Sequence, residues 1–409
     1  MLENDKVDDV HQMDREFKKA AERFEKLNCN TKTNIDMLRR FVMSCRHEGR
    51  KKATTVSYVN IAKRIVEVMH DIGIEKNIHE IDLYDFDTIL LHLEDEVELK
   101  PGTIRNYKKF IKKFFSWYIE ENPLDLSDHD KDKKWVRKIK LQNVESTVQP
   151  HEVLTQNELD QMLMSCHNNP RNKALLAVLA DGGMRIGALG SCRIKHVKFH
   201  EHGAMIYISK TSKSKKGTIS KGILLTWSSG YLEHWIASHP YAGDPDAPLW
   251  VNSNKNRNAM SYKSLRKTLE NMGKRAGINK RVNPHSFRHF AIVNWILDGL
   301  TEQEIKHRAG WIRGSTRVFE VYANFTDHEI NEQIYAKYGL IDDDNKRHVK
   351  LDRCSRCNNI LKPSDTFCPQ CLLMLELKSH NETPDGLRKH IIAEVIRIMS
   401  EREEKKMPS

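Results

Sequence analysis

Apolar residues recur at helical spacing along most of the chain and predict a mainly α-helical protein. The first 30 residues are charged but place Val10, Phe17 and Phe24 near one helical face, which predicts a single amphipathic helix over 1–30. From 31 to 124 the helical pattern is broken only by short polar turns. The predicted helices in this part span 34–45, 54–72, 81–95 and 102–122. We therefore expect a compact helical bundle.

The pattern changes twice after the bundle. Residues 125–150 are polar, lack an apolar period and end at Pro150, which predicts a linker. A capping box, Thr155 with Glu158, then begins a second domain over 151–345. Two segments of this domain, 204–209 and 219–226, alternate like strands around a lysine-rich turn. The expected fold class is mainly α with a small antiparallel β-sheet.

The stretch 283–322 predicts three short packed helices. Gly299 and Gly310 stand where helices should end, and Thr301 begins the second helix. Packing alone would make Trp311 and Tyr322 core aromatic residues. That interpretation gives no reason for the polar cluster His285, Arg288 and His289 at the start of an apolar run.

Length and charge narrow the class of protein. A chain of 409 residues exceeds one typical core, so two or three domains are expected. A formal net charge of +11 favours a polyanionic partner, of which nucleic acid is the leading candidate. No apolar run approaches the roughly 18 residues needed to cross a bilayer, and the first residues do not resemble a signal peptide. We expect a cytoplasmic protein without a membrane partner.

The eight cysteines fall into two groups. Four are scattered and predict ordinary reduced thiols. The others form two CxxC pairs, Cys354 with Cys357 and Cys368 with Cys371, separated by ten residues. This spacing allows two tight turns to place four thiolates around one structural zinc ion, which predicts a zinc ribbon over 350–376. The alternative, a pair of disulfides, is disfavoured in the cytoplasm.

The order of residues in the second domain resembles the tyrosine recombinase, or phage integrase, family. Arg185 follows a helix and a glycine turn, and a histidine, an arginine three residues later, a tryptophan after a glycine and a tyrosine follow downstream. The site residues implied by this resemblance are Arg185, Lys210, His285, Arg288, Trp311 and Tyr322. The family usually has a glutamate three residues after the first arginine, where this chain has Ala188.

The resemblance implies a site-specific recombinase that cleaves and rejoins DNA through a 3′-phosphotyrosyl intermediate. Tyr322 would be the nucleophile, the two arginines would bind the phosphate, and Lys210 would protonate the leaving 5′ oxygen. His285 would accept a proton, Trp311 would contact phosphate, and no catalytic metal is implied. Residues 31–124 would form a SAM-like core-binding domain. The partner would be double-stranded DNA, bound by a homotetramer that is a monomer or dimer when free.

Several alternatives remain open at this point. A type IB topoisomerase-like enzyme would use the same covalent chemistry, and an inactive zinc-ribbon DNA-binding regulator would need none. The cysteine pairs resemble the tail of some archaeal integrases, but the sequence leaves open whether this unit serves DNA binding, protein binding or stability. A charged helix over 380–409 carries the apolar stripe Leu387, Ile391, Val395 and Ile398. This stripe fits either the same chain or a neighbouring subunit.

Overall fold

A computed structural model describes two helical domains and a cysteine-containing unit. It covers residues 10–122, 134–142, 149–166, 169–208, 222–253, 257–311 and 314–316, and then 331, 335, 338–340, 351–361, 365, 368–371 and 373–375. Lys210, Tyr322 and the helix expected over 380–409 lie outside these residues. Within the described part, no helix is long and apolar enough to span a membrane.

The N-terminal helices enclose one core. They are α1 (Met13–Glu25), α2 (Lys32–His47), α3 (Lys52–Asp71), α4 (Leu83–Leu91), the short π-helix η1 (His92–Glu96), α5 (Pro101–Glu121) and α6 (Lys134–Lys138). The side chains of Phe41, Phe110 and Phe114 are fully buried together at the centre. Local sequence defines the helix starts, because Thr31 caps α2, Asp82 forms a capping box on α4 and Pro101 begins α5.

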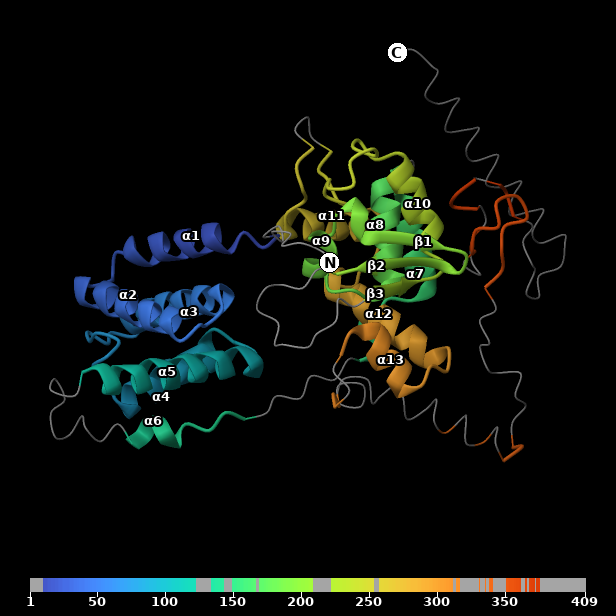
Figure 1. Ribbon diagram of the computed structural model, residues 1–409. Coiled ribbons are helices and arrows are strands. Elements are labelled where there is room, and N and C mark those ends of the chain that lie inside the picture. Colours follow the sequence, from blue (N-terminus) through green and yellow to red (C-terminus); the bar gives the residue numbers. More distant parts are fainter. Residues whose placement is uncertain are drawn as a thin grey trace, which may run out of the picture.

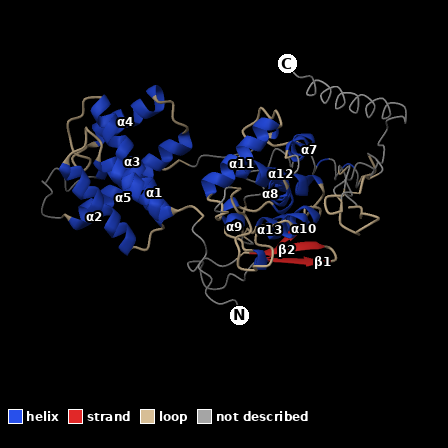
Figure 2. Cartoon of the chain, turned by 90° about the horizontal axis from the view of Figure 1, so that it is seen from above, coloured by secondary structure: helices blue, strands red, loops and turns tan. Residues whose placement is uncertain are grey.

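The C-terminal domain (residues 149–316) combines helices with a small sheet. Its elements are η2 (Pro150–Glu152), α7 (Gln156–Ser165), α8 (Pro170–Gly182), α9 (Ile186–Gly190), η3 (Ile194–His196), β1 (Val197–His200), β2 (Gly203–Tyr207), β3 (Gly222–Leu225), α10 (Ser229–Ala237), α11 (Tyr262–Arg275), α12 (Pro284–Leu297) and α13 (Glu302–Ala309). Helix α8 is buried along most of its length and packs against α10 and α12. The sheet lies along one side of the domain (Figure 2).

The three strands are antiparallel in the order β1-β2-β3, with Val197 opposite Ile206 and Ile206 opposite Ile223. The mostly helical fold with a small antiparallel sheet is therefore confirmed. Strand β1 was not predicted from the sequence. Its residues, Val-Lys-Phe-His, alternate apolar and polar types, but the run is only four residues long, so it gives a weaker periodic signal than a longer strand. In the structure only Val197 is buried and Phe199 is 42% exposed.

The sequence pattern predicted that the first helix includes Val10. In the structure, the segment just before α1 instead leaves the helix and joins the two domains. Gln12 adopts a left-handed conformation with φ of 49°, which directs the preceding residues away from α1. Val10 is buried in the core of the C-terminal domain, where its carbonyl accepts the Tyr262 amide at 2.9 Å. Further along, Glu16 pairs with Lys263 at 2.7 Å. Figure 1 shows this segment crossing from α1 towards α9 and α11.

Candidate functional site

The described site residues come from three places in the C-terminal domain. Arg185 is exposed at the start of α9, directly after the turn that ends α8. His285 and Arg288 lie in the first turns of α12, and Trp311 follows α13. Lys210 and Tyr322 remain predictions from the sequence, because the structure describes neither residue.

Two glycines bring Arg185 to its position. Gly183 ends α8 in a left-handed conformation with φ of 55°, which favours glycine. The space is also closed to side chains. A Cβ at Gly183 would lie 2.8 Å from the Trp295 ring, and one at Gly182 would lie 2.8 Å from Leu225. The chain can therefore turn tightly between α12 and β3 and place Arg185 immediately beyond.

Arg288 connects the separate parts of the site. Its side chain is buried, and its guanidinium donates to the Gly183 carbonyl at 2.6 Å and to the Ala309 carbonyl at 2.7 Å. It also lies over the Trp311 ring, with 5.3 Å between Cζ and the ring centroid. One forked side chain thus holds the turn before Arg185 and the end of the helix before Trp311.

The histidines at the start of α12 are placed by a helix cap. The Asn283 side chain accepts the backbone amide of His285 at 2.8 Å, which fixes the first turn. The rings of His285 and His289 are stacked, with centroids 5.3 Å apart. Burial, with smaller contributions from the charges of His285 and Arg288, lowers the pKa of His289 to about 4. His289 is therefore neutral at pH 7, whereas His285 is exposed to solvent.

Trp311 offers the N–H group of its indole ring as a hydrogen-bond donor. The residue is half-buried against the domain core, and its indole Nε1 has no hydrogen-bond partner among the described residues. A buried N–H without an acceptor is unfavourable by about 1–3 kcal/mol. Such an atom is suited to donating to an anion, and it cannot accept a proton.

A partly buried ion pair that sequence reasoning missed supports this arrangement. Asp181, near the end of α8, accepts hydrogen bonds from the amides and hydroxyls of both Thr226 and Ser228 at 2.6–3.2 Å. It also pairs with Arg308 of α13 at 3.2 Å. The guanidinium of Arg308 also lies over the Trp295 ring, with 4.5 Å between Cζ and the ring centroid. The pair joins the end of α8, the start of α10 and α13, the elements that surround the Arg185 turn.

The signal for Asp181 in the sequence was a single acid at the end of the apolar run 174–180, four residues before Arg185. A lone charge in a buried helix requires a partner. Its partners lie 45 to 127 residues away in sequence, so the pairing itself could not be predicted.

We expect Asp181→Asn to destabilise the C-terminal domain by about 3 kcal/mol, because it leaves the partly buried Arg308 charge without a counter-ion. The Asp181 side chain is 2% exposed. The matched control is Asp246→Asn, which breaks the pair with Lys195 at a side chain that is 61% exposed and should cost under about 1 kcal/mol. Urea unfolding followed by tryptophan fluorescence measures both variants. Equal effects for the two variants would contradict a structural role for the buried pair.

A basic hollow of about 430 Å³ lies between α8 and α11. The residues lining it include no acid: Arg171, Asn172, Thr268, Asn271, Lys274 and Arg275. Arg171 is buried, and its guanidinium donates to the Val251 carbonyl at 2.7 Å and to the Asn172 side chain at 2.8 Å. Burial lowers the pKa of Arg171. A buried cation balanced only by neutral oxygens makes the hollow suitable for an anionic group.

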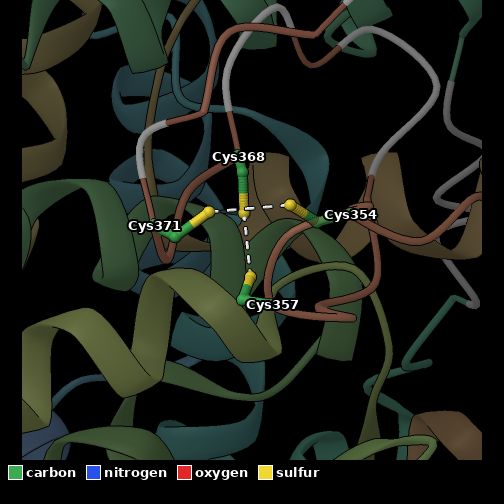
Figure 3. Close-up of side chains that lie close together, drawn as sticks. All are labelled: Cys354, Cys357, Cys368 and Cys371. Carbon is green, nitrogen blue, oxygen red and sulfur yellow. Dashed lines mark hydrogen bonds between the residues drawn. The ribbon is translucent and has the colours of Figure 1, made fainter.

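The four paired cysteines lie together (Figure 3). Their sulfur atoms are all within 4.8 Å of one another, with 3.6 Å between Cys354 and Cys371 and 3.5 Å between Cys357 and Cys368. These distances exceed a disulfide bond of about 2.05 Å. They are close to the separation of about 3.8 Å that follows from tetrahedral geometry with zinc–sulfur bonds of about 2.3 Å. The cysteines therefore fit a four-sulfur metal site.

The surroundings of the Cys354 thiol favour its ionisation. Burial opposes ionisation of Cys354, but backbone amides of Cys357 and Arg356 donate to its sulfur and lower its pKa to about 6. By contrast, burial raises the pKa of Cys368. Metal binding requires thiolates, so loading the site would release protons and weaken as the pH falls.

Comparison with known proteins gives a consistent assignment. Residues 152–329 match the model of the phage integrase family. The tyrosine recombinase XerC of Serratia marcescens is 30% identical over 135 residues, which is 32% of this chain and 42% of that protein. This chain therefore spans less than half of that relative's length.

Solved structures show the same fold. XerH site-specific recombinase bound to palindromic difH substrate aligns with a TM-score of 0.52 and 16% identity, over 80% of this chain and 96% of that one. A lambda integrase tetramer bound to a Holliday junction aligns with a TM-score of 0.51 and 14% identity, over 72% of this chain and 77% of that one. At these identities, the likeness establishes the fold.

Proposed function

Because this chain belongs to the phage integrase family of tyrosine recombinases, we propose that it is a site-specific recombinase that cleaves and rejoins DNA strands. The observation that carries the proposal is the position of Arg288. This buried guanidinium holds the Gly183 carbonyl, two residues before Arg185, and the Ala309 carbonyl, two residues before Trp311. The proposed phosphate-binding residues are thus connected through one side chain.

The reaction is a transesterification. The Tyr322 oxygen attacks the scissile phosphorus, the bond to the 5′ oxygen breaks, and a 3′-phosphotyrosyl link forms. Attack by a 5′ hydroxyl reverses these steps, so no oxidant, reductant or external energy source is needed. Because the bond energy is retained in the phosphotyrosyl link, the product can be joined to a second DNA strand.

Different side chains supply the proton transfers and the charge stabilisation that this reaction needs. Tyr322 has a reference pKa near 10, so attack at neutral pH needs a proton acceptor, which we assign to His285. Lys210 donates a proton to the departing 5′ oxygen. Arg185 and Arg288 stabilise the negative charge that builds on the phosphate oxygens. The Trp311 indole N–H donates to one of these oxygens, consistent with its lack of a partner among the described residues.

Double-stranded DNA is the proposed partner. The net charge of +11 and the acid-free hollow between α8 and α11 both favour the DNA backbone. We assign the hollow to a phosphate away from the scissile position. We further propose that four subunits assemble on two duplexes and that the free protein is a monomer or dimer. The lambda integrase structure named above is such a tetramer on a junction.

We propose that the N-terminal helices α1 to α6 form the SAM-like core-binding domain. It extends beyond the expected bounds of 31 and 124, because Phe24 of α1 and Val136 of α6, which lies in the expected linker, share its core. Some basic side chains of this domain are already paired within it. Lys113 pairs with Glu48 at 2.5 Å, and Lys112 donates to the Ile139 carbonyl at 2.9 Å. Lys51 and Lys100 are exposed at helix starts and are better candidates for DNA contact.

The cysteine unit is proposed to be a zinc ribbon that binds one structural zinc ion. Four protein ligands leave no open coordination position, so the ion would stabilise the fold and take no part in catalysis. Neither the topoisomerase-like enzyme nor the inactive regulator gains support from the described residues. The resemblance of the ribbon to archaeal integrase tails and the helix over 380–409 remain predictions.

A covalent-adduct assay tests the function. The protein is incubated with nicked duplex DNA that carries candidate recombination sites, and adducts that survive denaturant are collected and mapped by mass spectrometry. We expect the DNA to be covalently attached to Tyr322. Mapping to Tyr335 or Tyr338, or the absence of an adduct on every candidate site, would contradict the assignment of the nucleophile.

A further inference from the structure

The cysteine unit rests on the outer side of the C-terminal domain, next to α10 (Figure 1). The Tyr231 hydroxyl of α10 donates to the Asp365 carboxylate at 2.9 Å, and the Gln370 side chain donates to the Glu233 carboxylate at 2.9 Å. Neither the function proposed above nor the family likeness explains these contacts. They identify the start of α10 as a docking surface for the chain's own cysteine unit.

The cysteine unit also lies close to α10 at Gly230. A Cβ at this position would lie 2.5–2.7 Å from three atoms of the Asn359 side-chain amide. Asn359 is buried, and its carbonyl accepts the Cys354 amide at 2.8 Å. The residue that presses on α10 thus belongs to the turn that presents the first metal ligand, so the shape of the metal site and the shape of the docking surface depend on each other.

Charge argues against DNA as the occupant of this surface. Glu233 and Asp365 both lie in the contact, and their carboxylates accept hydrogen bonds from neutral side chains. Two acids would repel a phosphate backbone. Burial, followed by the neighbouring Asp365 carboxylate, raises the pKa of Tyr231, so the phenol remains protonated and donates.

The unit is too small to hold this shape through apolar burial. Among the described residues, its buried core consists of Cys354, Leu361 and Cys368, and two of these are proposed metal ligands. In comparable small units the bound metal supplies most of the folding free energy. Without the ion, the turn that carries Asn359 would lose its geometry.

We propose that the cysteine unit is a metal-dependent intramolecular brace whose partner is the start of α10 in the same chain. With zinc bound, the unit stays docked against the start of α10. Without zinc, the unit separates from α10 while the domain remains folded. This inference rests on the proposed zinc binding but not on the recombinase chemistry.

Hydroxyl-radical footprinting of the full chain tests the brace, with Tyr231 as the reporter. Chelation of zinc, verified by a colorimetric metal assay, should increase modification of Tyr231 by about tenfold, as expected for local release of a docked segment. Tyr262 on α11, which lies in the same domain, should be unchanged. Protection of Tyr231 that persists after the zinc has been removed would overturn the proposal.

A glycine variant separates docking from metal binding. Gly230→Leu adds a side chain where Asn359 presses on α10, and leucine is a better helix former than glycine, so α10 itself is not weakened. We expect one zinc per chain and an exposed Tyr231. The matched control is Gly243→Leu, because a Cβ there meets nothing within 4 Å, and it should behave as the parent protein. A protected Tyr231 in the Gly230 variant would contradict the assigned docking surface. Neither measurement depends on DNA cleavage.

Discussion

Replacing Tyr322 with phenylalanine should abolish the covalent DNA adduct and leave DNA affinity unchanged. The substitution removes only the oxygen that we propose as the nucleophile, so no phosphotyrosyl bond could form at this residue. The rate of adduct formation on nicked duplex DNA should fall below detection, a loss of more than about 10³-fold. Adduct is measured by denaturing gel electrophoresis and affinity by equilibrium binding of the same DNA.

Two neighbouring tyrosines provide matched controls. Tyr335 and Tyr338 are 47% and 76% exposed, so Tyr335→Phe and Tyr338→Phe should neither destabilise the protein nor reduce adduct formation. If the adduct survived Tyr322→Phe but was lost in one of these variants, the nucleophile would be reassigned. Loss of DNA affinity in Tyr322→Phe would instead show that the substitution disturbs more than the chemical step.

The two arginines should respond differently to alanine. Both Arg185→Ala and Arg288→Ala are expected to slow adduct formation by about 10²–10³-fold at saturating DNA, because each removes proposed donors to the charge that develops on the phosphate. Only Arg288→Ala should also destabilise the domain, by about 3 kcal/mol, since it leaves the Gly183 and Ala309 carbonyls without their donor. Arg185 is exposed, and its loss should change stability by under about 0.5 kcal/mol.

Single-turnover adduct rates and urea unfolding of the same preparations distinguish these effects. The lysine variants are the useful controls because they keep the charge but lose the planar fork. Arg288→Lys can reach one of the two carbonyls at most and should remain destabilised. An Arg288→Ala protein that is as stable as the parent would show that this side chain does not hold the two loops. Normal cleavage in Arg185→Ala would remove that residue from the proposed site.

The site is stabilised by contacts between elements that are distant in sequence. Arg288 and the Asp181–Arg308 pair each connect the end of α8 to α13. Arg185 is exposed and Trp311 is half-buried, so these two side chains contribute little to the stability of the fold. We infer that the rigidity required for transition-state stabilisation comes from Arg288, Arg308 and Asp181.

The sequence by itself determined the local features of this protein. Capping residues such as Thr155 and Thr301 predicted helix starts, and both capping boxes are present. Gly310 predicted a helix end and adopts the left-handed conformation expected there. The spacing of the two CxxC pairs predicted the cysteine cluster, because each signal lies within a few residues and depends on short-range geometry.

Only the tertiary structure decided which distant groups meet. Val10 matched the apolar face of the first helix but lies in the core of the other domain, because a left-handed turn at Gln12 redirects the chain. The sequence marked Arg288 as a site residue but not its two carbonyl partners, and it gave no sign that Asn359 presses on Gly230. These pairings depend on packing between separate elements, whereas helix periods and capping motifs record only the conformation of neighbouring residues.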